Sequence, residues 1–171
     1  MRANLVPMTI VVTLMACQRP APPHSGSALL DPGHATAMID SVRSFAESVA
    51  LGVTSRGPAA WRTYFADEPA FFMAADGRLA FPNSDAVSRA IPGLARAIPH
   101  IELRWGDSVI VDPLAPGLAM FAAPYRETQT NASGHRVQED GFFTGIAEHR
   151  PVGWQFRDAH WSDATPPTAV P

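Results

Sequence analysis

The stretch Trp154-Gln-Phe-Arg-Asp-Ala-His-Trp-Ser162 decides how the second half of this chain is read. Aromatic and polar residues alternate at its start, which is typical of a half-buried β-strand. Three similar runs precede it, separated by short turn sequences, at residues 100–111, 118–128 and 136–149. We therefore predict four antiparallel strands, joined as a meander, after residue 99.

The first part of the chain has helical periodicity instead. Asp31-Pro32 predicts a helix start, with Asp31 as the cap, and apolar residues then recur at helical spacing to about residue 54. A second, short helix is expected from Pro58. A third should begin at Asn83 or Ser84, with a kink or restart at Pro92.

A short hairpin is predicted between the second and third helices. Residues 71–75 and 78–81 read as strands, and Asp76-Gly77 between them is a strong two-residue turn signal. Helices followed by a run of strands predict an α+β domain, with the helices on one face of an antiparallel sheet.

This order of elements resembles the nuclear-transport-factor-2-like (NTF2-like) superfamily, and within it the secreted SnoaL-like and ketosteroid-isomerase-like branch. The resemblance spans residues 34–162. It is carried by Trp154, by the end of the last strand at His160-Trp-Ser162, and by Gly141-Phe-Phe-Thr-Gly145. It implies a cone-shaped domain, in which a strongly curved antiparallel or mixed sheet wraps three N-terminal helices and leaves a pocket open at one end.

The N-terminus predicts a bacterial lipoprotein. Residues 1–16 combine Arg2 with a short apolar run, and Leu-Met-Ala-Cys17 resembles a lipobox, whose cysteine is acylated after cleavage. The run is too short to span a membrane, which takes ~20 apolar residues. Residues 17–33 read as a flexible linker and residues 163–171 as a disordered tail. We expect a lipid-anchored, extracytoplasmic protein of the cell envelope. Gln18 after the cysteine favours the outer membrane in a Gram-negative cell.

Composition excludes several function classes. Cleavage would remove Arg2 and leave 12 basic against 16 acidic residues, a formal charge of −4, so no nucleic-acid partner is expected. The chain contains no lysine, which excludes Schiff-base chemistry and a Walker-type phosphate loop. With Cys17 lipidated no thiol remains, and the six histidines show no metal-ligand spacing. No cofactor and no metal are expected.

Strand alternation selects the candidate catalytic pair. Trp154, Phe156, Asp158, His160 and Ser162 would share one face of the last strand, and its apolar start indicates the concave side. Asp158 could then orient the imidazole of His160 and raise its basicity. The alternative is an ordinary structural hydrogen bond between these residues and a loop or helix end.

Five further residues are candidates for binding a ligand. Tyr64 and Tyr125 could donate a phenolic hydrogen bond to a ligand carbonyl, Trp61 could cover the pocket, and Trp154 and Ser162 would line it. Core packing is the competing interpretation for the two tyrosines and Trp61.

Three functional hypotheses remain open. The first is a pocket that binds a small, mostly apolar molecule. The second is an acid–base enzyme of isomerase, cyclase or hydratase type that uses His160 and Asp158. The third is an assembly module of the envelope. A homodimer through the convex face of the sheet is expected from the superfamily. Trp105 and Trp161 could both point outward there, and a place in the core is the alternative for Trp105.

Overall fold

The computed structural model describes residues 30–164 of the chain. The predicted signal peptide (1–16), the candidate lipidation site Cys17, and most of the predicted linker and tail lie outside this range. Regular structure extends slightly beyond the predicted domain of residues 34–162, because the first helix begins at Pro32 and the last strand ends at Asp163. Within residues 30–164, no helix is both long and apolar enough to cross a membrane.

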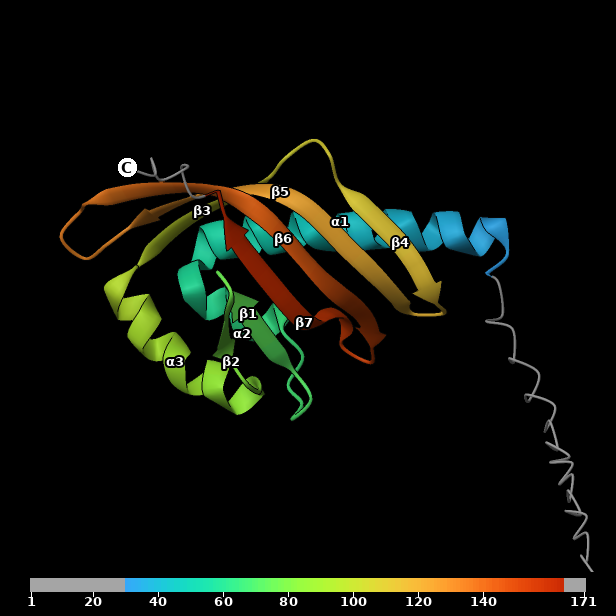
Figure 1. The fold of residues 1–171 in the computed structure, drawn as a ribbon, viewed down its shortest axis with the longest axis horizontal. Helices are drawn as coiled ribbons and strands as arrows, with labels where there is room; N and C mark the ends of the chain where they lie inside the picture. The colour runs from blue at the N-terminus through green and yellow to red at the C-terminus, as the bar shows by residue number, and fades with distance from the viewer. Residues whose placement is uncertain (1–29, 165–171) are drawn as a thin grey trace, which may run out of the picture.

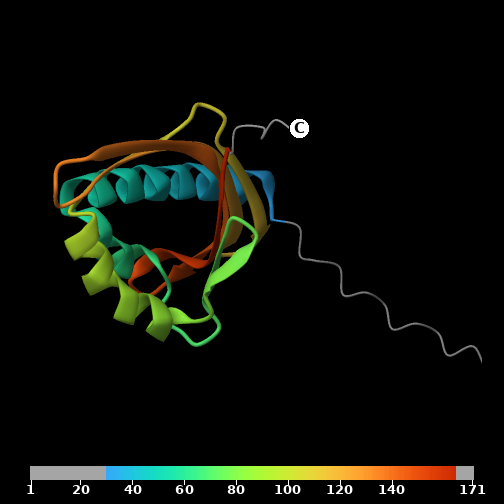
Figure 2. The same cartoon turned by 60° about the vertical axis from the view of Figure 1, so that its left-hand side comes forward.

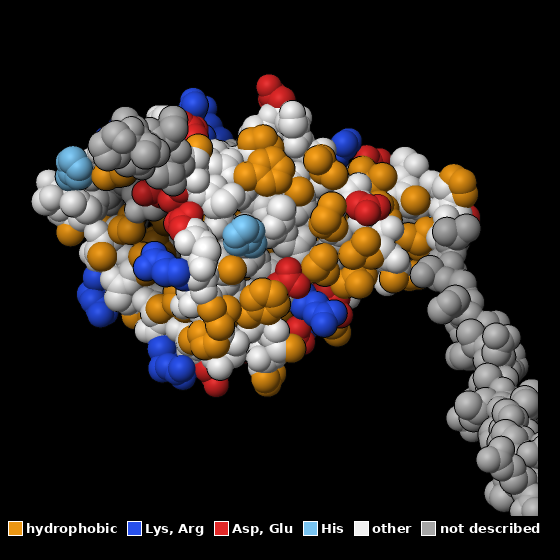
Figure 3. All heavy atoms as spheres, in the orientation of Figure 1, with side chains coloured by type: hydrophobic (Ala, Val, Ile, Leu, Met, Phe, Trp, Pro, Cys, Tyr) orange, Lys and Arg blue, Asp and Glu red, His pale blue; other side chains and the backbone are white. Residues whose placement is uncertain are grey.

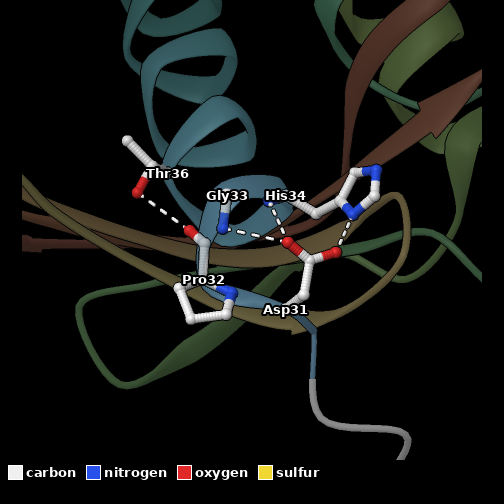
Figure 4. A network of polar contacts seen from close by, with 5 residues as sticks. All are labelled: Asp31, Pro32, Gly33, His34 and Thr36. Atoms are coloured by element: carbon white, nitrogen blue, oxygen red, sulfur yellow. Dashed lines mark hydrogen bonds and ion pairs between the residues drawn. The ribbon is translucent and has the colours of Figure 1, made fainter.

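The first helix, α1, spans Pro32–Arg56 and begins as predicted. The Asp31 carboxylate accepts hydrogen bonds from the backbone amides of Gly33 (3.0 Å) and His34 (3.1 Å), and Pro32 occupies the first turn (Figure 4). The side chain of His34 also contacts the second carboxylate oxygen, and this hydrogen bond lowers the pKa of Asp31. Such a cap contributes about 1 kcal/mol.

The remaining helices and the hairpin also follow the sequence pattern. A 3₁₀ turn (Gly57–Ala60) leads into α2 (Trp61–Tyr64), and β1 (Phe72–Ala75) and β2 (Arg78–Phe81) form the hairpin. Asp76 (φ 48°) and Gly77 (φ 74°) both adopt positive φ, as this two-residue turn requires. α3 spans Ser84–Ala97, capped by Asn83. It continues through Pro92 as one helix, so the prediction of a restart there is wrong.

Five longer strands complete a seven-stranded sheet with the order β2-β1-β7-β6-β5-β3, in which β4 also pairs with β5. The sheet is mixed, because β1 runs parallel to β7 and every other pair is antiparallel. The bounds are β3 His100–Trp105, β4 Ile110–Ala115, β5 Leu118–Thr130, β6 Arg136–Arg150 and β7 Gly153–Asp163.

One predicted strand is wrong in its extent. Residues 100–111 do not form a single strand: the chain leaves the sheet after Trp105 and returns at Ile110 to pair with the other end of β5. Pro113 lies within β4 rather than in a turn. This is tolerated because, within the part of the chain that the structure describes, β4 pairs with β5 alone, and its other edge needs no donor from proline.

The sheet curves around α1, which runs along its inner side, while α3 and the β1–β2 hairpin lie across the domain from α1 (Figures 1 and 2). One stripe of α1 packs on the sheet, because its apolar residues recur at helical spacing. The largest fully buried side chains are Phe71, Phe121, Phe143, Phe156, Val42, Val49 and Val53. The α+β cone expected from the sequence is therefore observed.

Candidate functional site

A β-bulge in β7 determines which side chains face the inside of the cone. Ala147 of β6 pairs with Phe156 and Ile146 pairs with Asp158, so Arg157 is an extra residue in the ladder. Side chains alternate with a period of two, and one extra residue therefore exchanges the two faces of the strand beyond it. Phe156 points inward, and after the bulge Ala159 is the next buried residue.

The prediction that the alternating residues from Trp154 to Ser162 share one face of β7 is therefore wrong. Asp158, His160 and Ser162 follow the bulge and lie on the outer side of the sheet. Trp154 and Phe156 precede the bulge, so the exchange of faces does not affect them. Asp158 accepts a hydrogen bond from the backbone amide of Ile146 (3.1 Å), which holds the bulge, and burial raises its pKa. His160 is exposed, and no hydrogen bond joins it to Asp158 in the described part of the chain.

The inner face of the same strand helps to form a pocket of about 230 Å³ at the end of the cone closed by α3. This volume lies just below the usual range for ligand sites and suits a small molecule. Most of the lining is apolar and comes from α2, α3, the β1–β2 hairpin and the sheet. It includes Trp61, Phe65, Met73, Phe81, Val87, Ala90, Ile91, Leu94 and Trp161.

The polar part of the lining consists of acidic residues and their partners. Glu127 of β5 lies directly opposite Glu139 of β6 in the register of the sheet. The side-chain amide of Gln129 donates to Glu127 Oε1 (2.8 Å) and to Glu139 Oε2 (3.2 Å), and so bridges the two carboxylates.

The two glutamates have perturbed acidities. Burial raises the pKa of Glu127 to about 7, with a smaller contribution from the charges of Glu139 and Asp163. Burial, followed by the charges of Asp163 and Asp76, raises the pKa of Glu139. At neutral pH both protonation states of Glu127 are populated, so this group can accept or donate a proton.

Tyr125 and Asp163 form a second polar pair in the pocket. The Tyr125 hydroxyl donates to the Asp163 carboxylate, and burial together with this bond raises the pKa of Tyr125. Gly141 lies between them in the sheet, and a Cβ on Gly141 would lie 2.6 Å from the Tyr125 hydroxyl. The absence of a side chain at Gly141 therefore allows Tyr125 to reach across β6 to β7.

The hairpin turn supplies the last acidic group of the lining. Asp76 accepts a hydrogen bond from the backbone amide of Asp163 (3.0 Å), and its own amide donates to Trp161 O (3.1 Å). The residues described here contain no group of three or more His, Cys, Asp or Glu side chains arranged to hold a metal ion.

Two of the predicted ligand-binding residues line this pocket, namely Trp61 and Tyr125. Tyr64 is instead a core residue, whose hydroxyl donates to Ser48 O (2.7 Å) beneath α1. The Trp154 indole donates to Ser41 Oγ (2.8 Å), and the Ser162 hydroxyl donates to Phe142 O (3.1 Å). Neither Trp154 nor Ser162 is part of the lining.

Comparison with solved structures places this architecture among known folds. It is similar to an NTF2-like superfamily protein from Salmonella enterica (TM-score 0.59, 10% identity, 80% of this chain and 95% of the other). A protein provisionally described as a scytalone dehydratase from Novosphingobium aromaticivorans gives a TM-score of 0.66 at 8% identity, over 80% and 91% of the two chains. A type 2 hexachlorocyclohexane dehydrochlorinase gives 0.60 at 10% identity, over 79% and 92%.

The chain has the NTF2-like fold. No protein-family model matches the sequence. No curated protein matches it either. At these identities the likeness to solved structures establishes the fold, and the chemistry of this NTF2-like domain must be argued from its own pocket.

Sequence reasoning missed Glu127, Gln129, Glu139 and Asp163. Glu127 and Gln129 continue the inward alternation of Phe121 and Tyr125 on β5, so alternation alone could have found them. The sequence pattern places Asp163 in the tail, and its side chain joins the pocket only because the bulge puts it on the inner face of β7.

Proposed function

We propose that the pocket binds a small, mostly apolar molecule and that Glu127 is its proton-transfer group. The observation that supports this is a largely apolar cavity with one glutamate whose pKa is raised by burial to about 7. A general acid–base group works best when its pKa lies near the operating pH. Glu127 thus takes the role that the sequence suggested for His160 and Asp158.

Enzymes occur among the similar structures, since two of them are named as a dehydratase and a dehydrochlorinase. That likeness supports an enzymatic function without specifying a substrate. The groups that would carry out catalysis in this chain are Glu127, its partner Gln129 and the hydroxyl of Tyr125 in the same pocket.

Mass spectrometry of molecules that co-purify with the protein tests the pocket. We expect a bound small molecule with the wild type and its loss in Ala90→Phe, which fills the cavity from α3. Ala97→Phe, exposed at the end of the same helix, is the matched control and should retain the molecule. Equal recovery from both variants would show that the molecule binds elsewhere.

We also propose that the outer face of the sheet forms a homodimer interface. The prediction that Trp105 and Trp161 point outward is wrong, because both indoles point inward and stack on each other with ring centroids 6.2 Å apart. Other apolar side chains gather over the outer sheet instead, as the orange surface in Figure 3 shows. Phe72 (45%), Phe142 (39%), Ile110 (51%) and Leu114 (46%) are exposed.

Light scattering tests this interface. The wild type should have twice the chain mass, and Phe142→Glu should have the mass of one chain, because a charge on an apolar interface opposes association. Val152→Glu, in the exposed turn after β6, is the control and should remain dimeric. A monomeric wild type at high concentration would contradict the proposal.

We further propose that Cys17 anchors the chain to the envelope as an extracytoplasmic lipoprotein. The support is the sequence of residues 1–17, in which Cys17 is the single cysteine of the chain. Cys17→Ser should abolish incorporation of labelled fatty acid and release the protein from the membrane fraction. A serine variant that is still acylated would refute this.

A further inference from the structure

We infer that the molecule bound in this pocket carries a basic nitrogen on an apolar body, and so binds as an organic cation. This inference rests on the proposed function of the pocket and specifies the class of its ligand. It follows from the balance of charges and of hydrogen-bond donors and acceptors in the lining.

The lining has a surplus of negative charge. Four carboxyl groups face the cavity, from four different places in the chain: Asp76, Glu127, Glu139 and Asp163. Among residues 30–164, no arginine or histidine belongs to the lining, and the sequence contains no lysine. Burial raises the pKa of Glu139, and the charges of Asp163 and Asp76 raise it further, as expected for neighbouring carboxylates that repel one another. A cationic ligand would relieve this repulsion, whereas an anionic one would increase it.

The hydrogen-bond donors beside these carboxylates are already engaged. The Tyr125 hydroxyl donates to Asp163, and the amide of Gln129 donates to both Glu127 and Glu139. Each ionised carboxylate accepts about four hydrogen bonds, so the lining keeps unfilled acceptors. A ligand with several N–H donors can fill these acceptors, whereas a carbonyl oxygen, which only accepts, leaves them unfilled.

The aromatic walls fit the same ligand. Trp61 stacks on Phe65 at 4.8 Å and meets Trp161 edge-on at 5.6 Å, and all three side chains line the cavity. Faces of tryptophan and phenylalanine bind apolar groups, and they also attract cations through the charge distribution of the ring. The apolar side accommodates the body of the ligand, and the carboxylates accommodate its ammonium group.

Calorimetric titration of the purified full chain with three probes tests the inference. The probes 4-phenylbutylamine, 4-phenylbutanol and 4-phenylbutyrate share one apolar body and differ in charge. We expect the amine to bind at least tenfold more tightly than the alcohol, which is about 1.4 kcal/mol, and the carboxylate to bind most weakly. Glu139→Gln should reduce the preference for the amine over the alcohol, and a thermal melt of the variant reports that it is folded.

The control variant is Glu102→Gln, which changes an exposed carboxylate outside the lining and should keep the full preference. Equal affinity for amine and alcohol would overturn the cationic ligand while leaving the pocket in place. Failure of all three probes would contradict the proposed pocket as well. Displacement of the amine by Ca²⁺ at equal concentration would show a metal-binding site instead and would also overturn the inference.

Discussion

Replacing Glu127 by glutamine should make the protein more stable at alkaline pH and leave its stability unchanged at acidic pH. The ordinary pKa of a glutamate is 4.5, and burial raises that of Glu127 to about 7 in the folded protein. Between these two values the unfolded chain has released the proton while the folded protein retains it. The unfolded state therefore binds fewer protons, and the free energy of unfolding falls as the pH rises through this window.

The size of the effect follows from the shift. Each pKa unit corresponds to about 1.4 kcal/mol, so the ionised Glu127 costs the folded state roughly 3 kcal/mol above pH 7. Glutamine has nearly the same shape, can still accept from Gln129, and never carries the charge. The variant should therefore gain up to about 3 kcal/mol at pH 8 and close to nothing below pH 4.5.

Urea unfolding of wild type and variant at pH 4, 5.5 and 8 measures this difference directly. Glu47→Gln, an exposed carboxylate on α1, is the control and should give the same small difference at every pH. A Glu127→Gln variant that is no more stable than the wild type at pH 8 would refute the claim that the buried, ionised carboxylate of Glu127 destabilises the folded protein. The proposed role of Glu127 in proton transfer would lose its support with it.

Three further substitutions test the geometry of the site. Gly141→Ala should destabilise the protein by at least about 2 kcal/mol in thermal melts, because the added methyl would clash with the backbone carbonyl oxygen of Ser162 and lie 2.6 Å from the Tyr125 hydroxyl; a variant as stable as the wild type would contradict this close packing of β6. Tyr125→Phe removes the hydroxyl that donates to Asp163 and should cost about 1–2 kcal/mol in urea unfolding, so no measurable loss would argue against that bond. His160→Ala, on the exposed outer face, should change stability by less than about 0.5 kcal/mol and leave titrated pocket affinities intact; a sharp loss of binding would restore His160 to the site.

The order of the elements was determined by the sequence itself, because it depends on local signals. Asp31-Pro32 caps α1, Asp76-Gly77 forms the hairpin turn, and alternation marks β5, β6 and β7. These signals act over a few residues and depend little on the rest of the molecule. They were enough to predict an α+β domain with its helices on one face of the sheet, whereas the cone was predicted from the resemblance to the NTF2-like superfamily.

Which residues of β7 belong to the site was decided by tertiary structure alone. The extra residue Arg157 in β7 turns Asp158 and His160 outward and Asp163 inward, and period-two alternation cannot reveal such a bulge. The bulge depends on pairing with β6, where Gly145 leaves room: a Cβ there would lie 2.7 Å from Asp158 O. Side chains can be assigned to a face from one strand, but the register between strands exists only in the folded sheet.

The acidity of the pocket has the same origin. Glu127 and Glu139 are separated in the sequence by a turn, and the pairing of β5 with β6 brings them opposite each other. Packing of α3 and the hairpin then removes water from around them, and burial raises their pKa values. Sequence supplied the carboxylates, whereas their proximity and their unusual acidity arise from long-range pairing and desolvation, which no local pattern encodes.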